Sequence, residues 1–261
     1  MIGVERLNFA YKKGSPIFTN FDWAITPGDR WSIIGPSGCG KSTLLYLLAG
    51  LYFPLSGKIN LNGYQKPGCR VSSGLILQDY GLLPWATALD NVSLGLRIQG
   101  LDKRKVLEIA QKWLSELGID GVASHYPAEL SGGQRQRVAI ARTLCLEPRL
   151  LLMDEPFASL DALTREDMQN LILDLWKRLS STMVLVTHNI EEAVFWGQKI
   201  MILNHPPNTA PIIMENPESG SLSYRHAADF VSRCKQLREL VEQKGWNGKS
   251  SYADSEEIKH E

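Results

Sequence analysis

The sequence predicts an α/β fold built on a mostly parallel sheet, and three segments carry this prediction. Residues 150–153 and 183–186 are short, continuous apolar runs, the pattern of strands that are buried on both faces. Between them, residues 160–179 place apolar side chains on one face of a helix, namely Met168, Leu171, Ile172, Leu175 and Leu179. A strand, a helix and a second strand in this order form the unit from which parallel sheets are assembled.

The first part of the chain adds strands and a helix on either side of a glycine-rich loop. Residues 1–24 contain alternating and aromatic-rich runs, and residues 30–34 form a short apolar run that leads directly into glycine. We expect a buried strand at 30–34 and another strand at 58–61. A helix is expected over 41–51, ending before Pro54 because proline cannot continue it.

The rest of the chain contains two more predicted helices and a polar end. Apolar residues recur at helical spacing between 101 and 117, namely Val106, Ile109, Ala110, Trp113, Leu114 and Leu117. Residues 211–214 are a candidate last strand, and residues 227–243 are a charged helix. Residues 244–261 are polar and poor in large apolar side chains, so we expect them to be disordered.

The composition supports a folded protein with balanced charge. The 261 residues include 28 basic and 28 acidic side chains, and 44% are hydrophobic. This balance argues against a strongly basic nucleic-acid-binding protein, so we expect no nucleic-acid partner. Long uncharged runs such as 42–57 are shorter than the roughly 20 apolar residues of a membrane-spanning helix. Residues 1–6 show no secretory signal, which predicts a cytoplasmic protein.

The cysteines and histidines show no metal-binding pattern. Cys39, Cys69, Cys145 and Cys234 are scattered without a C-x-x-C spacing, and the five histidines are not paired at metal-ligand spacing. We therefore expect reduced thiols and no metal held by histidine.

Residues 35–42 match the pattern G-x-x-x-x-G-K-[ST] between a predicted strand and a predicted helix, the context in which this pattern binds nucleoside triphosphates. The glycines let backbone N–H groups point at phosphate oxygens, and the helix N-terminus adds partial positive charge. Lys41 is expected to reach the β and γ phosphates, and Ser42 to ligate Mg²⁺. The predicted nucleotide contacts are Gly35, Ser37, Gly38, Cys39, Gly40, Lys41, Ser42 and Thr43.

Two carboxylates, Asp154 and Glu155, directly follow the apolar run at 150–153. In a parallel sheet, the carboxyl end of this strand opens onto the same crevice as the glycine-rich loop. Asp154 is therefore expected to assist the metal, and Glu155 to polarise a water that attacks the γ-phosphate. The alternative is a pair of solvated carboxylates without a catalytic role.

Two further motifs complete a family pattern. Residues 130–134, Leu-Ser-Gly-Gly-Gln, precede a helix rich in Arg and Ala, and Thr187-His188 follows an apolar strand. Together with the loop at 35–42, they make the chain resemble the nucleotide-binding subunits of ABC transporters over roughly residues 1–205. The resemblance implies the ABC ATPase fold, a P-loop NTPase core with a mostly parallel sheet, an antiparallel β part and a helical subdomain.

This resemblance also implies a domain division and an assembly. The ABC ATPase domain would cover residues 1–220, with the helical subdomain at about 79–145, followed by a C-terminal helix and polar tail at 221–261. Two copies would form a head-to-tail homodimer with ATP held between the Lys41 loop of one subunit and a segment of the other. That segment is Ser131, Gly132, Gly133 and Gln134.

Four more residues receive roles from the resemblance. Tyr11 would stack on adenine, although aromatic residues in a first strand commonly serve packing. Gln78 would act in catalysis and at the metal, at the junction with the helical subdomain. His188 would contact the γ-phosphate, the alternative being a histidine that is merely hydrogen-bonded at a strand end. Asp161, shortly after the carboxylates, would belong to the nucleotide site.

The run at 77–85, followed by 89–92, resembles the group of importers for nitrate, sulfonates and taurine. A chain with the ATPase part alone also favours an importer subunit at the cytoplasmic face of the inner membrane. The implied partners are two transmembrane permease subunits and, indirectly, an extracytoplasmic solute-binding protein. The solute would be small and anionic, such as a sulfonate, taurine or nitrate.

Trp85, next to Pro84, is expected to be exposed near Gln78 and to anchor a coupling helix of the membrane subunit, because large apolar anchors dominate such interfaces. The alternative buries Trp85 in its own subdomain. Cys39 is either a small side chain of no special role or a thiol beside the phosphates. In the second case, alkylation would inhibit hydrolysis and bound ATP would protect.

Two rival functions are weighed against the importer. A soluble ABC ATPase acting in DNA repair, translation or cluster assembly would show a long coiled-coil insertion, basic arms or two ATPase domains. The segment between Gln78 and Ser131 has ordinary length instead. A nucleotide-binding scaffold without catalysis is disfavoured because Gln78, Glu155 and His188 are all present.

Overall fold

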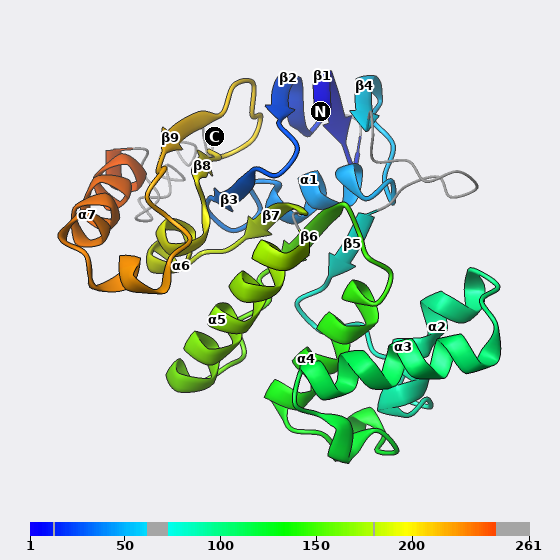
Figure 1. Ribbon diagram of the computed structural model, residues 1–261. Coiled ribbons are helices and arrows are strands. Elements are labelled where there is room, and N and C mark those ends of the chain that lie inside the picture. The colour runs from blue at the N-terminus through cyan, green and yellow to red at the C-terminus, as the bar shows by residue number, and fades with distance from the viewer. Residues whose placement is uncertain (13, 62–72, 180, 244–261) are drawn as a thin grey trace, which may run out of the picture.

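The computed structural model describes residues 1–12, 14–61, 73–179 and 181–243, and its strands form two sheets (Figure 1). The larger sheet has six strands in the order β5-β6-β7-β3-β8-β9. Its neighbouring strands are parallel, except that β9 runs antiparallel to β8. The strands are β3 Arg30–Ile34, β5 Ser73–Ile76, β6 Leu150–Asp154, β7 Thr182–Val186, β8 Lys199–Ile202 and β9 Ile212–Glu215.

The smaller sheet is antiparallel, with the order β2-β1-β4, and lies at the top of Figure 1. Its strands are β1 Ile2–Ala10, β2 Pro16–Ile25 and β4 Ser56–Leu61. Helix α1, Lys41–Leu48, packs between the two sheets. One apolar cluster joins them, with Phe18 and Phe21 from β2, Leu44 and Leu45 from α1, and Leu152 from β6. This packing fixes the start of α1, where the glycine-rich loop ends.

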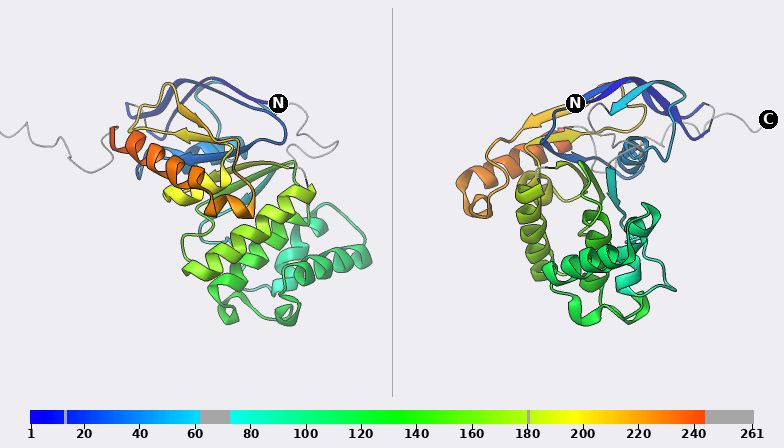
Figure 2. Two further views of the ribbon diagram at one scale, coloured as in Figure 1. Left: turned by 60° about the vertical axis from the view of Figure 1, so that its left-hand side comes forward. Right: turned by 45° about the vertical axis from the view of Figure 1, so that its right-hand side comes forward.

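A helical region projects away from both sheets, at the lower right of Figure 1 and again in both views of Figure 2. The chain leaves β5 to enter it and returns at β6. It contains α2 Ala88–Ile98, α3 Lys103–Glu116, α4 Gly132–Leu144 and the short 3-10 helices η1 Asp120–Val122 and η2 Pro127–Glu129. Its apolar side chains belong to the same cluster as α5 and the facing side of β6, so the region is anchored to the larger sheet.

Three further α-helices follow strands of the larger sheet. These are α5 Ala162–Leu179, α6 Ile190–Trp196 and, after the 3-10 helix η3 Leu222–His226, the last described helix, α7 Ala228–Gln243. Leu237 and Val241 of α7 pack in one buried cluster with Ile34 of β3 and Met214 of β9. The last described helix therefore contributes to the core of the main body. The domain division at residue 220 stays a prediction.

Arg30 joins the start of β3 to the segment that precedes η3. Arg30 is 2% exposed, and its guanidinium lies 4.4 Å from the ring centre of Trp176 and donates through Nη2 to the Ser219 carbonyl at 2.7 Å. Gly220 has a φ of 90°, and a Cβ there would lie 2.0 Å from Arg30 Nη1. Burial lowers the pKa of Arg30 to about 10. Only glycine leaves room for this guanidinium.

The α/β class and its central elements are as predicted. The strands at 30–34, 150–153 and 183–186 are present, and so is the helix after Leu160. Helix α1 ends at Leu48 and not at residue 51, because Gly50 adopts a left-handed φ of 73° that stops the helix. The long helix of the helical region begins at Lys103, where Asp102 caps it by accepting the Arg104 N–H.

Besides the short 3-10 helices, four elements were not predicted from the sequence: β5, α2, α6 and β8. Strands β5 and β8 have four residues each, and α6 has seven, too few for a clear periodic pattern. Residues 244–261, expected to be disordered, and Cys69 lie outside the described residues. Across the described ranges, no helix is both long and apolar enough to cross a membrane.

Candidate functional site

The glycine-rich loop connects β3 to α1 and turns through left-handed backbone. Gly38 and Gly40 have φ values of 77° and 107°, and a Cβ on Gly40 would lie 2.5 Å from a methyl carbon of Ile17. Glycine is therefore required at residue 40 for both conformation and space. No side chain caps the N-terminus of α1. Its first N–H groups thus remain available to an anion, as in phosphate-binding loops.

Lys41 lies across this loop. Its ammonium donates to the carbonyls of Gly35 at 2.8 Å and Pro36 at 3.1 Å, and the residue is only 8% exposed. A buried ammonium with neutral acceptors binds a phosphate oxygen more strongly than these carbonyls, since a hydrogen bond between two ions is the stronger one. The loop therefore holds a cation where a phosphate group is expected.

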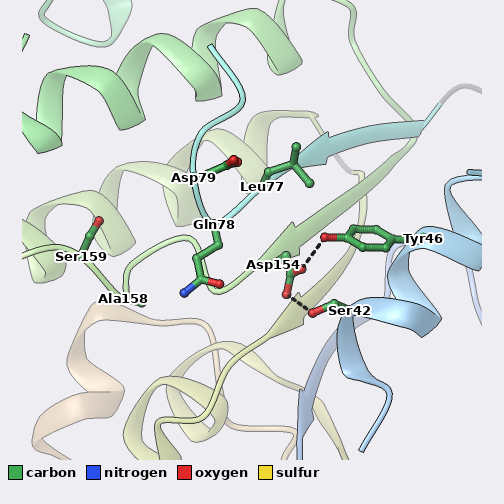
Figure 3. Close-up of a pocket in the computed structure, with 8 residues that line it drawn as sticks. All are labelled: Ser42, Tyr46, Leu77, Gln78, Asp79, Asp154, Ala158 and Ser159. Atoms are coloured by element: carbon green, nitrogen blue, oxygen red, sulfur yellow. Dashed lines mark hydrogen bonds between the residues drawn. The ribbon is translucent and has the colours of Figure 1, made fainter. Parts of the chain in front are cut away.

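A cavity of about 660 Å³ opens beside this loop, and Ser42, Gln78 and Asp154 line it (Figure 3). Ser42 Oγ donates to Asp154 Oδ1 at 3.0 Å, and the Tyr46 hydroxyl donates to Asp154 Oδ2 at 3.2 Å. Figure 3 shows the Gln78 amide reaching into the same space from the strand end after β5. Three oxygen-bearing side chains from three separate segments thus meet at one cavity.

The environment of Asp154 and Tyr46 is partly desolvated. Burial raises the pKa of Asp154, and the hydrogen bonds from Ser42 and Tyr46 oppose this rise. Burial, with the neighbouring Asp154 charge, raises the pKa of Tyr46 to about 12. Hydroxyl, carboxylate and amide oxygens are the hard ligands that Mg²⁺ prefers, so this donor set fits the predicted metal.

Glu155 and His188 form a pair next to this cavity. His188 Nδ1 lies 3.1 Å from Glu155 Oε2, with the imidazole side chain 65% exposed and the carboxylate side chain 20% exposed. Glu155 has a φ of 45°, uncommon for a residue with a side chain, and its N–H bonds the Val186 carbonyl at 2.9 Å. The structure thus holds the carboxylate in a constrained position, as functional sites commonly do.

Residues 131–134 form a capping box at the N-terminus of α4. The Gln134 N–H donates to Ser131 Oγ at 3.2 Å, and the Ser131 N–H donates to Gln134 Oε1 at 2.9 Å. A Cβ on Gly132 would meet nothing within 4 Å, so the chain itself does not require glycine there. Among the described residues, this segment does not line the cavity at Asp154. The space at Gly132 is therefore open to another molecule.

The structure places Tyr11 in an aromatic cluster on the smaller sheet. Its ring centre lies 5.2 Å from that of Phe9 and 5.6 Å from that of Tyr52, both edge to face. Its hydroxyl is 2.9 Å from Oγ1 of Thr43, which directly follows the phosphate loop. Tyr11 itself is 57% exposed. Tyr11 thus combines packing with an exposed ring close to α1.

Asp161 caps α5. Its Oδ1 accepts the Thr164 N–H at 3.1 Å, and the same contact lowers the pKa of its carboxyl. A Cβ on Gly133 would lie 3.2 Å from Thr164 Cγ2, which places the start of α5 beside the start of α4. Asp161 therefore lies on the side of residues 131–134, and its role toward a nucleotide stays a prediction.

Of the two alternatives for Cys39, the one with a reactive thiol beside the phosphates is wrong. Cys39 is fully buried in the apolar cluster between the sheets, where a Cβ on Gly35 would lie 2.5 Å from its sulfur. Burial raises its pKa, which disfavours the reactive thiolate. Its backbone N–H, bonded to the Pro36 carbonyl at 3.2 Å, belongs to the loop, while its side chain points into the core.

Asn208 and Asn91 have structural roles that the sequence analysis missed. Asn208 is 4% exposed and donates through Nδ2 to the Cys39 carbonyl at 2.9 Å, which supports the phosphate loop from behind. Asn91 is fully buried and bonds the backbone of Leu83, Ala86 and Thr87. Their partners are distant in sequence or lie in an irregular loop, so no local pattern marks them.

Trp85 is exposed, as expected, with 74% of its surface accessible. It lies in the loop that Asn91 holds at the start of α2. Ile98 at the other end of α2 is 77% exposed. The alternative in which Trp85 is buried in its own subdomain is wrong.

Comparisons with known proteins agree with these motifs. The family model described as ABC transporter matches residues 18–158. The taurine import ATP-binding protein TauB of Pseudomonas aeruginosa is 46% identical over 191 residues, which cover 73% of this chain and 73% of that protein. The nitrate import ATP-binding protein NrtD of Synechocystis sp. is 43% identical over 242 residues, which cover 89% of this chain and 91% of that protein.

Solved structures share the fold. A dimeric, post-hydrolysis state of the ATP-binding cassette MJ0796 with ADP and Pi superposes with a TM-score of 0.72 at 31% identity, covering 82% of this chain and 98% of that chain. The structure of cbiO1 from Clostridium perfringens has a TM-score of 0.74 at 27% identity, covering 93% of this chain and 97% of that chain. The predicted fold class is confirmed. The chain belongs to the ABC transporter family and is one of its ATP-binding ATPase cassettes.

Proposed function

We propose that this chain is the ATP-binding subunit of an importer and that it hydrolyses ATP to drive uptake of a small anionic solute. The observation that carries the proposal is the convergence of Lys41, Ser42, Asp154 and the Glu155–His188 pair at the carboxyl ends of neighbouring strands. The similarity to proteins named for taurine and nitrate import supports the solute class, because both solutes carry an anionic group.

ATP binding begins at the phosphate loop. The N–H groups at the start of α1 and the Lys41 ammonium surround the triphosphate, and Lys41 exchanges its carbonyl partners for phosphate oxygens. Tyr11 presents an exposed ring to the adenine base. Loss of Lys41 removes the only charged partner that the loop itself offers to the phosphates.

Ser42, Asp154 and Gln78 would hold Mg²⁺ at the cavity that they line. When bound, Mg²⁺ neutralises charge that develops on the phosphate oxygens. Tyr46 keeps Asp154 oriented through its hydrogen bond at 3.2 Å. Since Gln78 follows β5 at the entrance to the helical region, its side chain links nucleotide binding to the position of that region.

Glu155 orients the attacking water and accepts its proton, while His188 holds the carboxylate through the contact at 3.1 Å and faces the γ-phosphate. The second half of the site comes from another copy of the chain. Residues 131–134 of that copy approach the γ-phosphate in a head-to-tail dimer, and the open space at Gly132 suits such close approach.

The dimer would work on two transmembrane permease subunits at the cytoplasmic face of the inner membrane, with a solute-binding protein on the other side. The exposed Trp85 supports a docking surface on the helical region, because large aromatic side chains anchor interfaces. A DNA-repair or translation clamp has less support, given the balanced charge and the importer relatives.

The experiment uses the purified chain as bait on detergent-solubilised membranes, with ATP and Mg²⁺, followed by mass spectrometry. We expect a multi-spanning protein to be retained by the wild type and lost with Trp85→Ala, while intrinsic ATP hydrolysis is unchanged. The control is Val231→Ala, which removes an exposed apolar side chain from α7. Recovery of soluble or nucleic-acid-bound proteins alone would favour the clamp function.

A further inference from the structure

Glu192 is a buried carboxylate one turn beyond His188. It lies in the first turn of α6, its side chain is only 8% exposed, and burial raises its pKa. Asn189 caps the same turn by accepting the Glu192 N–H at 3.0 Å. A carboxylate that is removed from water needs strong partners. Glu192 has two, and they belong to different segments of the site.

The first partner is Thr187, the residue before His188. Thr187 Oγ1 donates to Glu192 Oε2 at 2.6 Å and accepts the Asn189 N–H at 3.0 Å. Both neighbours of His188 in the chain are therefore fixed through one hydroxyl. Since the hydroxyl proton goes to Glu192, this carboxylate determines how the backbone on each side of His188 is held.

The second partner is Arg165 in the first turn of α5. Arg165 Nε lies 3.7 Å from Glu192 Oε1, too far for a hydrogen bond, and this buried N–H has no other hydrogen-bond partner in the described part of the chain. Through Nη2, the same guanidinium donates to the Leu160 carbonyl at 2.8 Å. Arg165 thus connects Glu192 to the segment between Glu155 and α5.

These contacts surround one small space. A cavity of about 40 Å³ has Glu155 and His188 on its lining together with Arg165, Thr187 and Glu192. Ser159, next to Leu160, hydrogen-bonds the Tyr80 hydroxyl and lines the larger cavity that Gln78 enters. His188 and the Leu160 segment are therefore linked through this space. If one of them moves, the residues that surround the second move as well.

We propose that Glu192 is a positioning residue for ATP hydrolysis: it joins the His188 segment, through Thr187, to the Leu160–Asp161 segment, through Arg165. This inference rests on the proposed function for its kinetic part. Nucleotide binding that moves His188 brings Arg165 Nε within hydrogen-bond distance of Glu192, which orders the start of α5. Because α5 starts beside residues 131–134, this contact carries the state of one nucleotide to the segment that faces the other copy.

The test compares four variants of the full chain. Glu192→Gln keeps the shape but removes the charge that attracts Arg165, and Thr187→Val removes the donated hydroxyl at nearly constant volume. Thr187→Ser restores the hydroxyl. Glu191→Gln is the matched control, since it makes the same change one residue earlier at an exposed position. Thermal unfolding of each variant shows whether folding is retained.

For Glu192→Gln and Thr187→Val we expect kcat to fall about tenfold, while KM and nucleotide affinity by fluorescence change less than about twofold. Thr187→Ser is expected to recover most of the loss, and Glu191→Gln to behave as wild type. The proposal is overturned if Glu192→Gln keeps wild-type kcat. It is equally overturned if kcat, affinity and melting temperature fall together, which is the signature of a structural role.

Hydrogen exchange provides a readout that does not depend on turnover. Added ATP should protect amides at 187–189 and at 160–164 together in the wild type, and only those at 187–189 in Glu192→Gln. If the wild type does not hydrolyse ATP, the proposed function fails, and this exchange pattern still decides the role of Glu192. Protection of the two segments that is unaffected by Glu192→Gln would refute the coupling.

Discussion

Replacement of Asn91 by alanine tests whether the hydrogen bonds of its side-chain amide fix the loop before α2 that carries Trp85. Asn91 Oδ1 accepts the Leu83 N–H at 2.8 Å, and Nδ2 lies 3.2 Å from the Leu83 carbonyl and 3.0 Å from those of Ala86 and Thr87. The two Nδ2 protons are shared among three carbonyls, so about three effective hydrogen bonds are lost. Burial of the side chain is complete, so water does not already satisfy these groups.

At about 1 kcal/mol for each buried hydrogen bond, Asn91→Ala should lower the free energy of unfolding by about 3 kcal/mol. With a urea dependence of about 2 to 3 kcal/mol per M, the unfolding midpoint should fall by about 1 M. Arg97→Ala is the comparison on the same helix. It breaks an ion pair whose side chains are 51% and 44% exposed, and such surface pairs contribute at most about 1 kcal/mol.

The assay is urea unfolding followed by circular dichroism, together with the membrane capture described above. Asn91→Ala should be destabilised more than Arg97→Ala and should also retain less permease, because the loop that presents Trp85 is released. An Asn91→Ala midpoint equal to that of Arg97→Ala would refute the reasoning that the amide network organises this loop.

Three further outcomes are expected. Glu155→Gln should bind ATP, lose about 10²- to 10⁴-fold in hydrolysis, and accumulate as a dimer with ATP and Mg²⁺; a monomer by light scattering would contradict this. Lys41→Ala should fail earlier, with nucleotide affinity by fluorescence reduced at least about tenfold, since a charge-assisted contact is lost. Cys39 should resist alkylation in the folded chain with or without ATP and react after unfolding in urea, because its thiol is buried; rapid modification of the native protein would disprove this.

The local parts of the site could be predicted from the sequence because their chemistry lies in contiguous residues. The phosphate loop and the carboxylates after β6 each follow a buried strand, and parallel packing brings those strand ends together, while the role of the histidine after β7 came from the family resemblance. Family resemblance supplied the functions of Gln78 and residues 131–134, which no spacing argument gives. The exposure of Trp85 was also anticipated.

The missed features depend on side-chain direction and on distant partners. Cys39 lies in the phosphate loop, yet a loop residue can present its N–H to a ligand and its side chain to the core, and only coordinates distinguish the two. The partner of Tyr46, Asp154, is more than 100 residues away in sequence, and the partner of Asn208, Cys39, is more than 160 residues away. Glu192 bonds Thr187, which is only 5 residues away. The close contact of Glu192 escaped notice because it depends on the unforeseen helix α6.

The Arg30 contact affects where the gene can be interrupted. A break or an insertion at residue 220 would remove the Ser219 carbonyl and the left-handed glycine that together accommodate the guanidinium, and a buried cation would be left without its acceptor. Leu237 and Val241 would also leave the core. Circular permutation or fusion at this point should therefore yield insoluble protein, whereas an added domain after Gln243 leaves every described contact of α7 in place. The boundary expected at 220 thus lies next to a buried contact of the folded body, whereas a fusion after Gln243 spares the contacts of the last described helix.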